Sequence, residues 1–550
     1  MDHDGTDGLA PAREGPGAGE EDQAGSSRWS FLRNWWGGVF VLAAFACLVI
    51  TGLMGVNFGY RWDEPIQLGL VNHTITSGSF VPVSFYDYPG VTYLLSLLSV
   101  LPWVVHRLHS HATLTGADFY VHGRTVFLLV TSLGGIWLYL ALRRRAGELG
   151  AAFGGATYLL SFQLAYHARW IAPDAVLAMV TALFLWFLVI AWDAPSSGAR
   201  VFLPAIAAGL AMATKYQGAV LMIPVLVLFI KRWRTHAAPL SAQVRGLVVA
   251  SGLFLVTFLV ITPGAILRHH AFFKAIEFEN QHYRTGHTYF KGTKPYDVHN
   301  HLRYLLVSLR YVAVSLPSHI PALSWFVVAL GVIGFATLAW REPWLAAALG
   351  LPMVVVTIYY SGLVVFFARN LLLFLPFVAF LAGIGVGRLA ELAHTKLTFS
   401  ILAAVLLLVA LVNGAWLVTT AESILHESPA ELVRSTDRYM RDRPGTRFVV
   451  SGPLQEQFRT WGVPLPPNAR TSGSGDDYVA LFSQIVSGKD VTLRSWPATT
   501  EGTYRVIGPQ EVDFDFYPTW RYPDPDRVLV MTPSQARRFG LDRRELSIAG

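Results

Sequence analysis

The stretch Gly59-Tyr60-Arg61-Trp62-Asp63-Glu64-Pro65 follows directly on a first apolar run at residues 35–56. A run of about 20 apolar residues is long enough to cross a bilayer as a helix. Two adjacent carboxylates, Asp63 and Glu64, are costly to hold at the end of such a helix. A chain that places them there is expected to use them for chemistry or for handling ions.

The composition of the whole chain is that of a membrane protein. Of its 550 residues 53% are hydrophobic and 14% are charged, whereas soluble domains carry about 25% charged residues. Residues 1–34 are rich in Gly, Ala, Glu and Asp without apolar periodicity, so we predict a disordered cytoplasmic tail rather than a signal peptide. The single cysteine, Cys47, excludes a disulfide within the chain.

Eleven apolar runs predict eleven transmembrane helices. They lie at residues 35–56, 123–142, 150–169, 174–192, 201–214, 217–230, 246–263, 321–340, 343–361, 370–388 and 397–419. Basic clusters mark cytoplasmic turns, and the chain has three of them, at 143–145, 231–234 and 388–396. With the N-terminus in the cytoplasm, eleven helices place all three clusters inside and the C-terminus outside.

A further apolar segment at 91–105 does not fit as a span, because counting it would move the cluster at 143–145 to the outside. We predict a juxtamembrane helix that lies on the outer surface, and a twelfth span is the alternative. The membrane domain then covers residues 35–420 and has two long outer loops, 57–122 and 264–320.

The character of the sequence changes near residue 420. A capping box at Ser428-Pro429-Ala430-Glu431 begins an amphipathic helix. Short apolar runs at 448–450, 479–482 and 528–531 predict buried strands. The predicted fold class is therefore an all-α polytopic membrane protein with a small extracytoplasmic α/β domain at 421–550.

The acidic pair has two interpretations. Asp63 fits a general base that removes a proton from an attacking hydroxyl, with Glu64 positioning or tuning it. Asp63 also fits the N-cap of a helix that opens at Pro65. The two roles are compatible, and the sequence favours catalysis.

Four more polar side chains fall at the predicted outer ends of spans. Arg169 and Asp174 flank one short turn, where Asp174 also fits simple helix initiation after Pro173. Lys215, between two short spans, and Arg369, at the start of the tenth, fit phosphate ligands. Each also fits an interfacial anchor, but two cations that face one cavity together with carboxylates favour an anionic ligand.

The outer loop at 264–320 mixes acids, histidines and cations, including Arg284 and His287. Long loops of this kind often carry function, and we predict that this one binds substrate. A metal site with His and Glu ligands is the weaker interpretation, because the loop has no tight ligand repeat with a third ligand.

Taken together, these segments resemble the membrane-embedded C-type glycosyltransferases that use polyprenyl-phosphate sugars. The resemblance is to the branch of protein O-mannosyltransferases and lipid A aminoarabinose transferases. It covers residues 30 to 390 and depends on order and spacing rather than on a single motif. The segments that carry it are 63–64, 86–93, 169–174, 209–216 and 369–376.

This resemblance implies an inverting glycosyltransferase of the plasma (inner) membrane. It would move a sugar from a polyprenyl-phosphate donor to an acceptor hydroxyl of a cell-envelope glycan, lipid or protein on the outer face. Asp63 would match the catalytic base and Glu64 the second acid of its pair. Lys215 and Arg369 would match cations near the donor phosphate, and Asp174 the acid of the second outer loop.

The segment at 86–93 is similar to a family stretch that contains two prolines, but here it reads Asp87-Tyr88-Pro89-Gly90. We predict that Asp87 and Tyr88 contact substrate, and the departure puts a metal or acceptor role of the segment in doubt. The sequence leaves open whether Mg²⁺, Mn²⁺ or no metal is needed. Membrane lipid is an expected partner and nucleic acid is not.

Two other classes of protein fit this sequence less well. A transporter or lipid flippase would carry ionisable residues and broken helices near the midplane, often in paired repeats, whereas these charges cluster at one face. A non-catalytic receptor would use 421–550 as its binding module and would leave the acidic pair at 63–64 unexplained.

Overall fold

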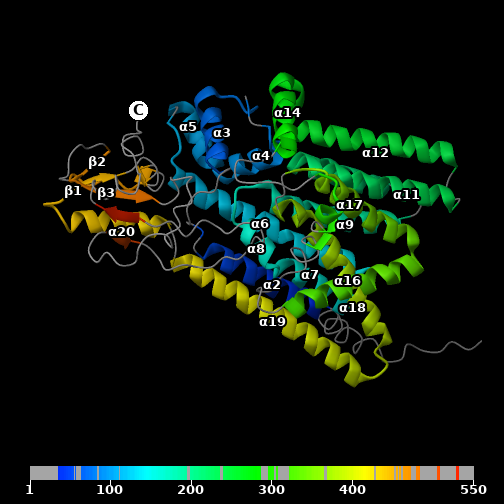
Figure 1. The fold of residues 1–550 in the computed structure, drawn as a ribbon. Helices are drawn as coiled ribbons and strands as arrows, with labels where there is room; N and C mark the ends of the chain where they lie inside the picture. Colours follow the sequence, from blue (N-terminus) through cyan, green and yellow to red (C-terminus); the bar gives the residue numbers. More distant parts are fainter. Residues whose placement is uncertain are drawn as a thin grey trace, which may run out of the picture.

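The structure is a computed structural model. It describes most of the chain between residues 35 and 471 and three strands beyond. The described residues are 35–54, 56, 64–82, 84, 86–110, 112–194, 199–235, 239–285, 295–302, 305–306, 321–364, 368–426, 429–450, 454–455, 458–459, 462–471, 478–483, 504–507 and 528–531. Figure 1 shows a long helical bundle with a small sheet at one end.

Eight described helices are long and apolar enough to cross a membrane, and each coincides with a predicted span. They are α2 (Trp36–Leu53), α6 (Gly116–Arg143), α9 (Pro173–Asp193), η2 with α11 (Tyr216–Leu221, Met222–Arg234), α12 (Leu240–Ile261), α17 (Pro343–Ser361), η3 with α18 (Ala368–Phe374, Leu375–Leu392) and α19 (Lys396–His426). The predicted spans at 201–214 and 321–340 appear as shorter apolar stretches, in α10 (Leu203–Thr214) and α16 (Pro321–Arg341).

The predicted span at 150–169 is two helices, α7 (Gly147–Leu159) and α8 (Phe162–Ala168). The break has a local cause at Ser161, whose hydroxyl accepts a hydrogen bond from the backbone N–H of Leu164. A serine in this role begins a new helix and ends the preceding one. The sequence did not predict this break, because both helices are apolar and read as one continuous run.

The segment predicted to lie on the outer surface is also two helices, α4 (Gly90–Ser99) and α5 (Leu101–Ser110). The two helices are bent by 79° relative to each other, so they do not form one straight span. Two large apolar side chains of α5, Trp103 and Val105, are exposed. The bent pair fits either a broken span or a helix pair that does not cross the membrane, so the juxtamembrane position stays a prediction.

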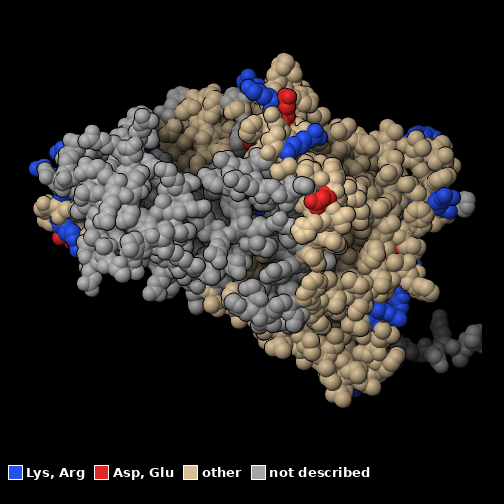
Figure 2. Space-filling model, in the orientation of Figure 1, with Lys and Arg blue, Asp and Glu red and all other residues tan. Residues whose placement is uncertain are grey.

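The three basic clusters meet at one end of the bundle, as the sequence predicts. Arg145 forms an ion pair with Glu342, with 2.9 Å between Nη1 and Oε1. The neighbouring Arg341 and Arg388 both pair with Glu391, and Lys231 lies within electrostatic range of Arg145 and Glu342. Figure 2 shows Lys and Arg side chains at the edge where α11 ends and α12 begins.

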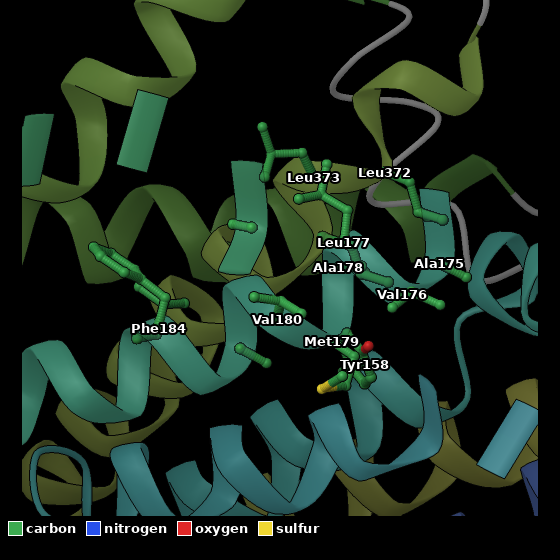
Figure 3. Packing of buried hydrophobic residues seen from close by; sticks show 14 of the residues in the cluster. Tyr158, Ala175, Val176, Leu177, Ala178, Met179, Val180, Phe184, Leu372 and Leu373 are labelled. Carbon is green, nitrogen blue, oxygen red and sulfur yellow. The ribbon is translucent and has the colours of Figure 1, made fainter. Parts of the chain in front are cut away.

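Two of the spans form the interior of the bundle. In the apolar windows of α9 and α18, 78% and 94% of the residues are buried, against 11% in α12 and 28% in α19. Figure 3 shows the side chains of α9 packed between Tyr158 and the segment that contains Leu372 and Leu373. The backbones of α16 and α18 approach closely at Gly334, where a Cβ atom would lie 1.9 Å from the carbonyl oxygen of Leu381. The helices α12 and α19 lie at the periphery of the bundle.

The residues after the last span form α20 (Pro429–Arg441) and a five-stranded sheet in the order β2-β1-β3-β5-β4. The strands are β1 (Arg447–Val450), β2 (Ala469–Arg470), β3 (Tyr478–Ser483), β4 (Tyr504–Ile507) and β5 (Val528–Met531). β1 is parallel to β2 and β3, and β5 is antiparallel to β3 and β4. The predicted helix and all three predicted strands are present, and the division of the chain at residue 421 stays a prediction.

Candidate functional site

Three spans, α9, α11 and α18, connect the basic end of the bundle to a second polar cluster at the opposite end. α9 begins beside Asp174 and ends at Asp193, which pairs with Arg145. α11 follows Lys215 and ends in its basic cluster, and α18 follows Asn370 and ends at the ion pair of Arg388. Asp174 and Lys215, which the sequence predicted for the outer face, therefore lie together at one end of the bundle.

Glu64 begins α3 (Glu64–Ser77) and is bonded on both carboxylate oxygens. Arg124 donates from Nε to Oε1 at 3.0 Å and from Nη2 to Oε2 at 2.5 Å. The backbone N–H of Ile171 donates to Oε1 at 3.1 Å. Both side chains of the ion pair are at most 1% exposed, so the pair is a planar, two-pronged contact that fixes the start of α3.

Arg124 holds both flanks of the segment 57–63. Besides Glu64, its guanidinium donates from Nη1 to the carbonyl oxygen of Val56 at 2.9 Å. Asp63, the predicted base, lies outside the described residues. Arg124 was not among the predicted site residues, although an arginine inside a predicted span is itself a sign of a functional or paired site.

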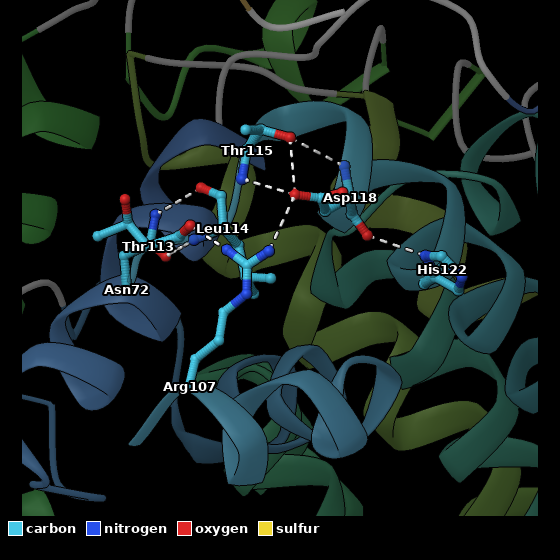
Figure 4. Close-up of polar contacts among 7 residues, drawn as sticks. All are labelled: Asn72, Arg107, Thr113, Leu114, Thr115, Asp118 and His122. Atoms are coloured by element: carbon cyan, nitrogen blue, oxygen red, sulfur yellow. Dashed lines mark hydrogen bonds and ion pairs between the residues drawn. The ribbon is translucent and has the colours of Figure 1, made fainter. Parts of the chain in front are cut away.

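Polar contacts at the start of α6 hold described residues of the predicted loop 57–122 (Figure 4). Asn72 on α3 exchanges two hydrogen bonds with the backbone of Leu114, at 3.0 and 2.7 Å. Thr115 and Asp118 form a capping box, and Arg107 of α5 contacts Asp118. These bonds fix α3 and α5 to the helix that carries the buried arginine.

The turn between α8 and α9 carries Arg169 and Asp174. Arg169 is 3% exposed, and its Nη2 donates to the carbonyl oxygen of Thr51 at 3.2 Å. Its Nε and Nη1 have no hydrogen-bond partner in the described part of the chain. A buried guanidinium is costly without a counter-charge, so this turn is suited to an anionic ligand.

Lys215 lies between α10 and η2 and is held by two oxygen atoms. Its Nζ donates to Oδ1 of Asp174 and to Oδ1 of Asn370, each at 2.6 Å. Burial lowers the pKa of Lys215, and the carboxylate of Asp174 opposes that shift. Arg369, next to Asn370, lies within electrostatic range of Asp174 and Lys215. The structure thus brings together the lysine, the arginine and the aspartate that the sequence predicted for one site.

The outer loop at 264–320 contributes the helix α14 (His269–Thr285) to this cluster. Asn370 donates from Nδ2 to the hydroxyl of Tyr283 at 3.1 Å, and burial raises the pKa of that phenol. Tyr283 was not among the predicted site residues. Arg284 is exposed and lies near Tyr359 instead, and His287 lies outside the described residues.

The segment that contains Asp87 and Tyr88 lies against the same region, and both side chains are half-buried. The hydroxyl of Tyr216 donates to the carbonyl oxygen of Tyr86 at 2.6 Å, and Asp87 lies within electrostatic range of Tyr216. The backbone N–H of Gly90 donates to the hydroxyl of Thr262 at 3.1 Å. Of the two predicted residues, Asp87 therefore lies near the residue that follows Lys215.

Among the described residues no three His, Cys, Asp or Glu side chains are placed to hold one metal ion. The need for a metal stays a prediction.

Residues 107–261 match the sequence profile of a family described as dolichyl-phosphate-mannose-protein mannosyltransferase. The fold is similar to that of ArnT from Cupriavidus metallidurans in its apo state, with a TM-score of 0.54, 16% identity and coverage of 92% of this chain and 98% of that one. The chain has the C-type glycosyltransferase fold. The resemblance predicted from the sequence is thereby confirmed.

A second ArnT structure agrees with this fold. ArnT bound to undecaprenyl phosphate gives a TM-score of 0.51 at 17% identity, over 90% of this chain and 97% of that one. The oligosaccharyltransferase of Archaeoglobus fulgidus in the apo form gives a TM-score of 0.45 at 12% identity, over 80% of this chain and 65% of that one. No curated protein sequence matches the chain.

Proposed function

We propose that the protein is a membrane glycosyltransferase that uses a polyprenyl-phosphate sugar as its donor. It transfers the sugar to an acceptor hydroxyl of a cell-envelope glycan, lipid or protein on the outer face of the plasma membrane. The N-terminus is cytoplasmic and the sheet after α19 is extracytoplasmic, because the basic clusters at the opposite end of the bundle belong in the cytoplasm.

One observation supports this proposal above all others. Glu64, at the start of α3, and the cations Lys215 and Arg369 lie at the same end of the bundle. Glu64 bonds to the backbone of Ile171, three residues before Asp174, which holds Lys215. A phosphate leaving group gains negative charge during transfer, and fixed cations stabilise that charge best. Lys215 and Arg369 are suited to this role, and ArnT, with a similar fold, binds undecaprenyl phosphate.

We propose the following reaction, with Asp63 as its base. Asp63 removes the proton of the acceptor hydroxyl, and the oxygen attacks the anomeric carbon from the face opposite the phosphate. The bond between the anomeric carbon and the phosphate oxygen breaks, and polyprenyl phosphate leaves with the bonding electron pair. Glu64 acts as a positioning residue for its neighbour Asp63, because both of its oxygens are already bonded.

The alternative of a transporter or lipid flippase is not favoured. Coupling residues of transporters lie near the midplane, whereas the described ion pairs of this bundle gather at its two ends.

The experiment that tests the proposal uses the purified full-length protein in detergent. Undecaprenyl-phosphate mannose, glucose, galactose and arabinose are supplied with cell-envelope acceptors, and released undecaprenyl phosphate is measured by mass spectrometry. We expect release with at least one donor from the wild type and from Glu277→Gln, a change on the exposed side of α14. We expect no release from Asp63→Asn, and retained release in that variant would refute the proposal.

The same assay decides the metal requirement. We propose Mg²⁺ or Mn²⁺ as the ion if one is needed, since both prefer oxygen ligands. Loss of release in EDTA, with recovery when one of the two ions is added back, is the expected signature of a metal-dependent reaction.

A further inference from the structure

Arg169 is a buried cation in the turn between α8 and α9. The residue is 3% exposed, and every residue at 162–174 is buried. The ring of the neighbouring Trp170 lies against Tyr166 and His167, with centroids 4.9 and 4.8 Å away. A charge that is held away from water in this way is costly unless a counter-charge matches it.

The two acids that contact this turn are matched by other cations. Glu64 bonds to the backbone of the turn and forms its ion pair with Arg124. Asp174 forms its ion pair with Lys215. These three cations, counted with Arg169, therefore outnumber the two carboxylates by one. Arg169 is the cation that forms no ion pair with a described carboxylate.

A structural role in α2 does not account for this charge. The Nη2 group of Arg169 donates to the carbonyl oxygen of Thr51 at 3.2 Å, in the last turn of α2, where carbonyl groups lack a partner within the helix. A cation near a helix C-terminus is favourable, but less so than the burial of a guanidinium is costly. The Nε and Nη1 groups remain, and neither has a hydrogen-bond partner in the part of the chain that the structure describes.

We propose that Arg169 binds an oxyanion of a substrate, with Nε and Nη1 donating to a phosphate or carboxylate group. The guanidinium presents its N–H groups in a fixed planar fork that matches such groups. Both nitrogen atoms are buried, so binding includes a local displacement of the residues that cover them. The bound anion supplies the counter-charge that the protein by itself lacks.

The source of the oxyanion rests on the proposed function. A transferase of this kind offers two sources, the phosphate of the polyprenyl donor and an acidic group of the acceptor. The site itself does not depend on that function, because the unmatched charge is a property of the protein without substrate.

The first test measures the stability of the full-length protein without substrate. Arg169→Met removes the unmatched charge and is expected to raise Tm in detergent micelles by about 1–3 °C. Arg124→Met is the matched control, since it removes an equally buried arginine from an ion pair and is expected to lower Tm. A lower Tm for Arg169→Met, or its failure to fold, would mean a structural role and would overturn the inference.

The second test identifies the source of the oxyanion. Undecaprenyl phosphate is titrated into the wild type, Arg169→Met and Arg388→Met, and Kd is obtained from the rise in Tm. If Arg169 binds the donor phosphate, Arg169→Met is expected to raise Kd about 10–150-fold, the equivalent of one lost hydrogen bond to a charged group. Arg388→Met changes a surface arginine at the basic end of the bundle and is expected to bind like the wild type.

The acceptor is tested with cell-envelope acceptors that are separated by anion exchange into acidic and neutral fractions. If Arg169 binds an acidic group of the acceptor, Arg169→Met is expected to leave Kd for undecaprenyl phosphate unchanged and to raise KM for the acidic fraction about 10–150-fold. Unchanged values of both Kd and KM would overturn the inference. Failure of the wild type to release undecaprenyl phosphate from any donor would overturn the transferase proposal, and the Tm of Arg169→Met would still decide whether the site exists.

Discussion

The buried ion pair of Glu64 and Arg124 allows a strong prediction about stability. Replacing Arg124 with Met leaves the carboxylate of Glu64 buried without its cation, and Glu64→Leu leaves the guanidinium without its anion. Breaking a buried pair in this way costs about 3–5 kcal/mol. If the two costs were independent, the double variant would lose about 6–10 kcal/mol, which is as much as a typical protein's whole stability.

We expect the double variant Glu64→Leu with Arg124→Met to be far more stable than that sum. An apolar pair in place of a buried ion pair is often neutral or stabilising. What remains is the cost of two backbone groups that lose their partners, the N–H of Ile171 and the carbonyl of Val56. At about 1–2 kcal/mol each, the expected loss is about 2–4 kcal/mol.

The assay is equilibrium unfolding of the full-length protein in mixed detergent micelles, followed by tryptophan fluorescence, for the wild type, both single variants and the double variant. The exposed pair of Arg388 and Glu391 provides the control, since the variant Arg388→Met is expected to cost less than about 1 kcal/mol. The expected coupling between the two buried positions is about 3 kcal/mol or more. Additive losses, or single losses no larger than that of Arg388→Met, would refute the reasoning.

Three further predictions concern other parts of the site. Gly90→Ala should destabilise the protein, because a Cβ atom there would lie 1.8 Å from the carbonyl oxygen of Ile261. In Gly69→Ala of α3 the added Cβ atom meets nothing within 4 Å, and this variant should be more stable by about 0.5–1 kcal/mol. Thermal unfolding of both variants checks this prediction. Lys215→Met should lower the free energy of unfolding by about 3–5 kcal/mol, because it leaves Asp174 buried without the ammonium that pairs with it. This variant should also release no undecaprenyl phosphate. The double variant Lys215→Met with Asp174→Leu should regain stability in the unfolding assay but should still release no undecaprenyl phosphate. Burial lowers the pKa of His282 below its ordinary 6.5, so as the pH falls the unfolded chain takes up the proton first. The contribution of this residue to stability is therefore complete above about pH 6.5 and is lost as the pH falls below it. The free energy of unfolding should differ less between pH 5 and pH 7.5 for His282→Gln than for the wild type.

Much of the architecture follows from the sequence because the bilayer imposes lengths and charges that can be read residue by residue. The runs that became α2, α9 and α18 are apolar over about the thickness of a membrane. Basic clusters favour the cytoplasmic side of the membrane, so all three were predicted to lie on the same side. Arg145 and Arg388 do lie at the same end of the bundle. Local capping signals likewise predicted α20.

The break at Ser161 shows the limit of this reading. Hydrophobicity does not distinguish one long apolar helix from two short ones, and the decision depends on a single hydroxyl that bonds to a backbone N–H.

Charge and position in the sequence predicted which residues gather at one end of the bundle: Lys215, Asp174 and Arg369 are polar side chains at the ends of apolar runs. Only the tertiary structure decided how they are used. It placed Arg124 of α6 on Glu64 and Tyr283 on Asn370. These contacts join residues 60 or more positions apart in the chain, so they follow from packing in three dimensions rather than from local sequence.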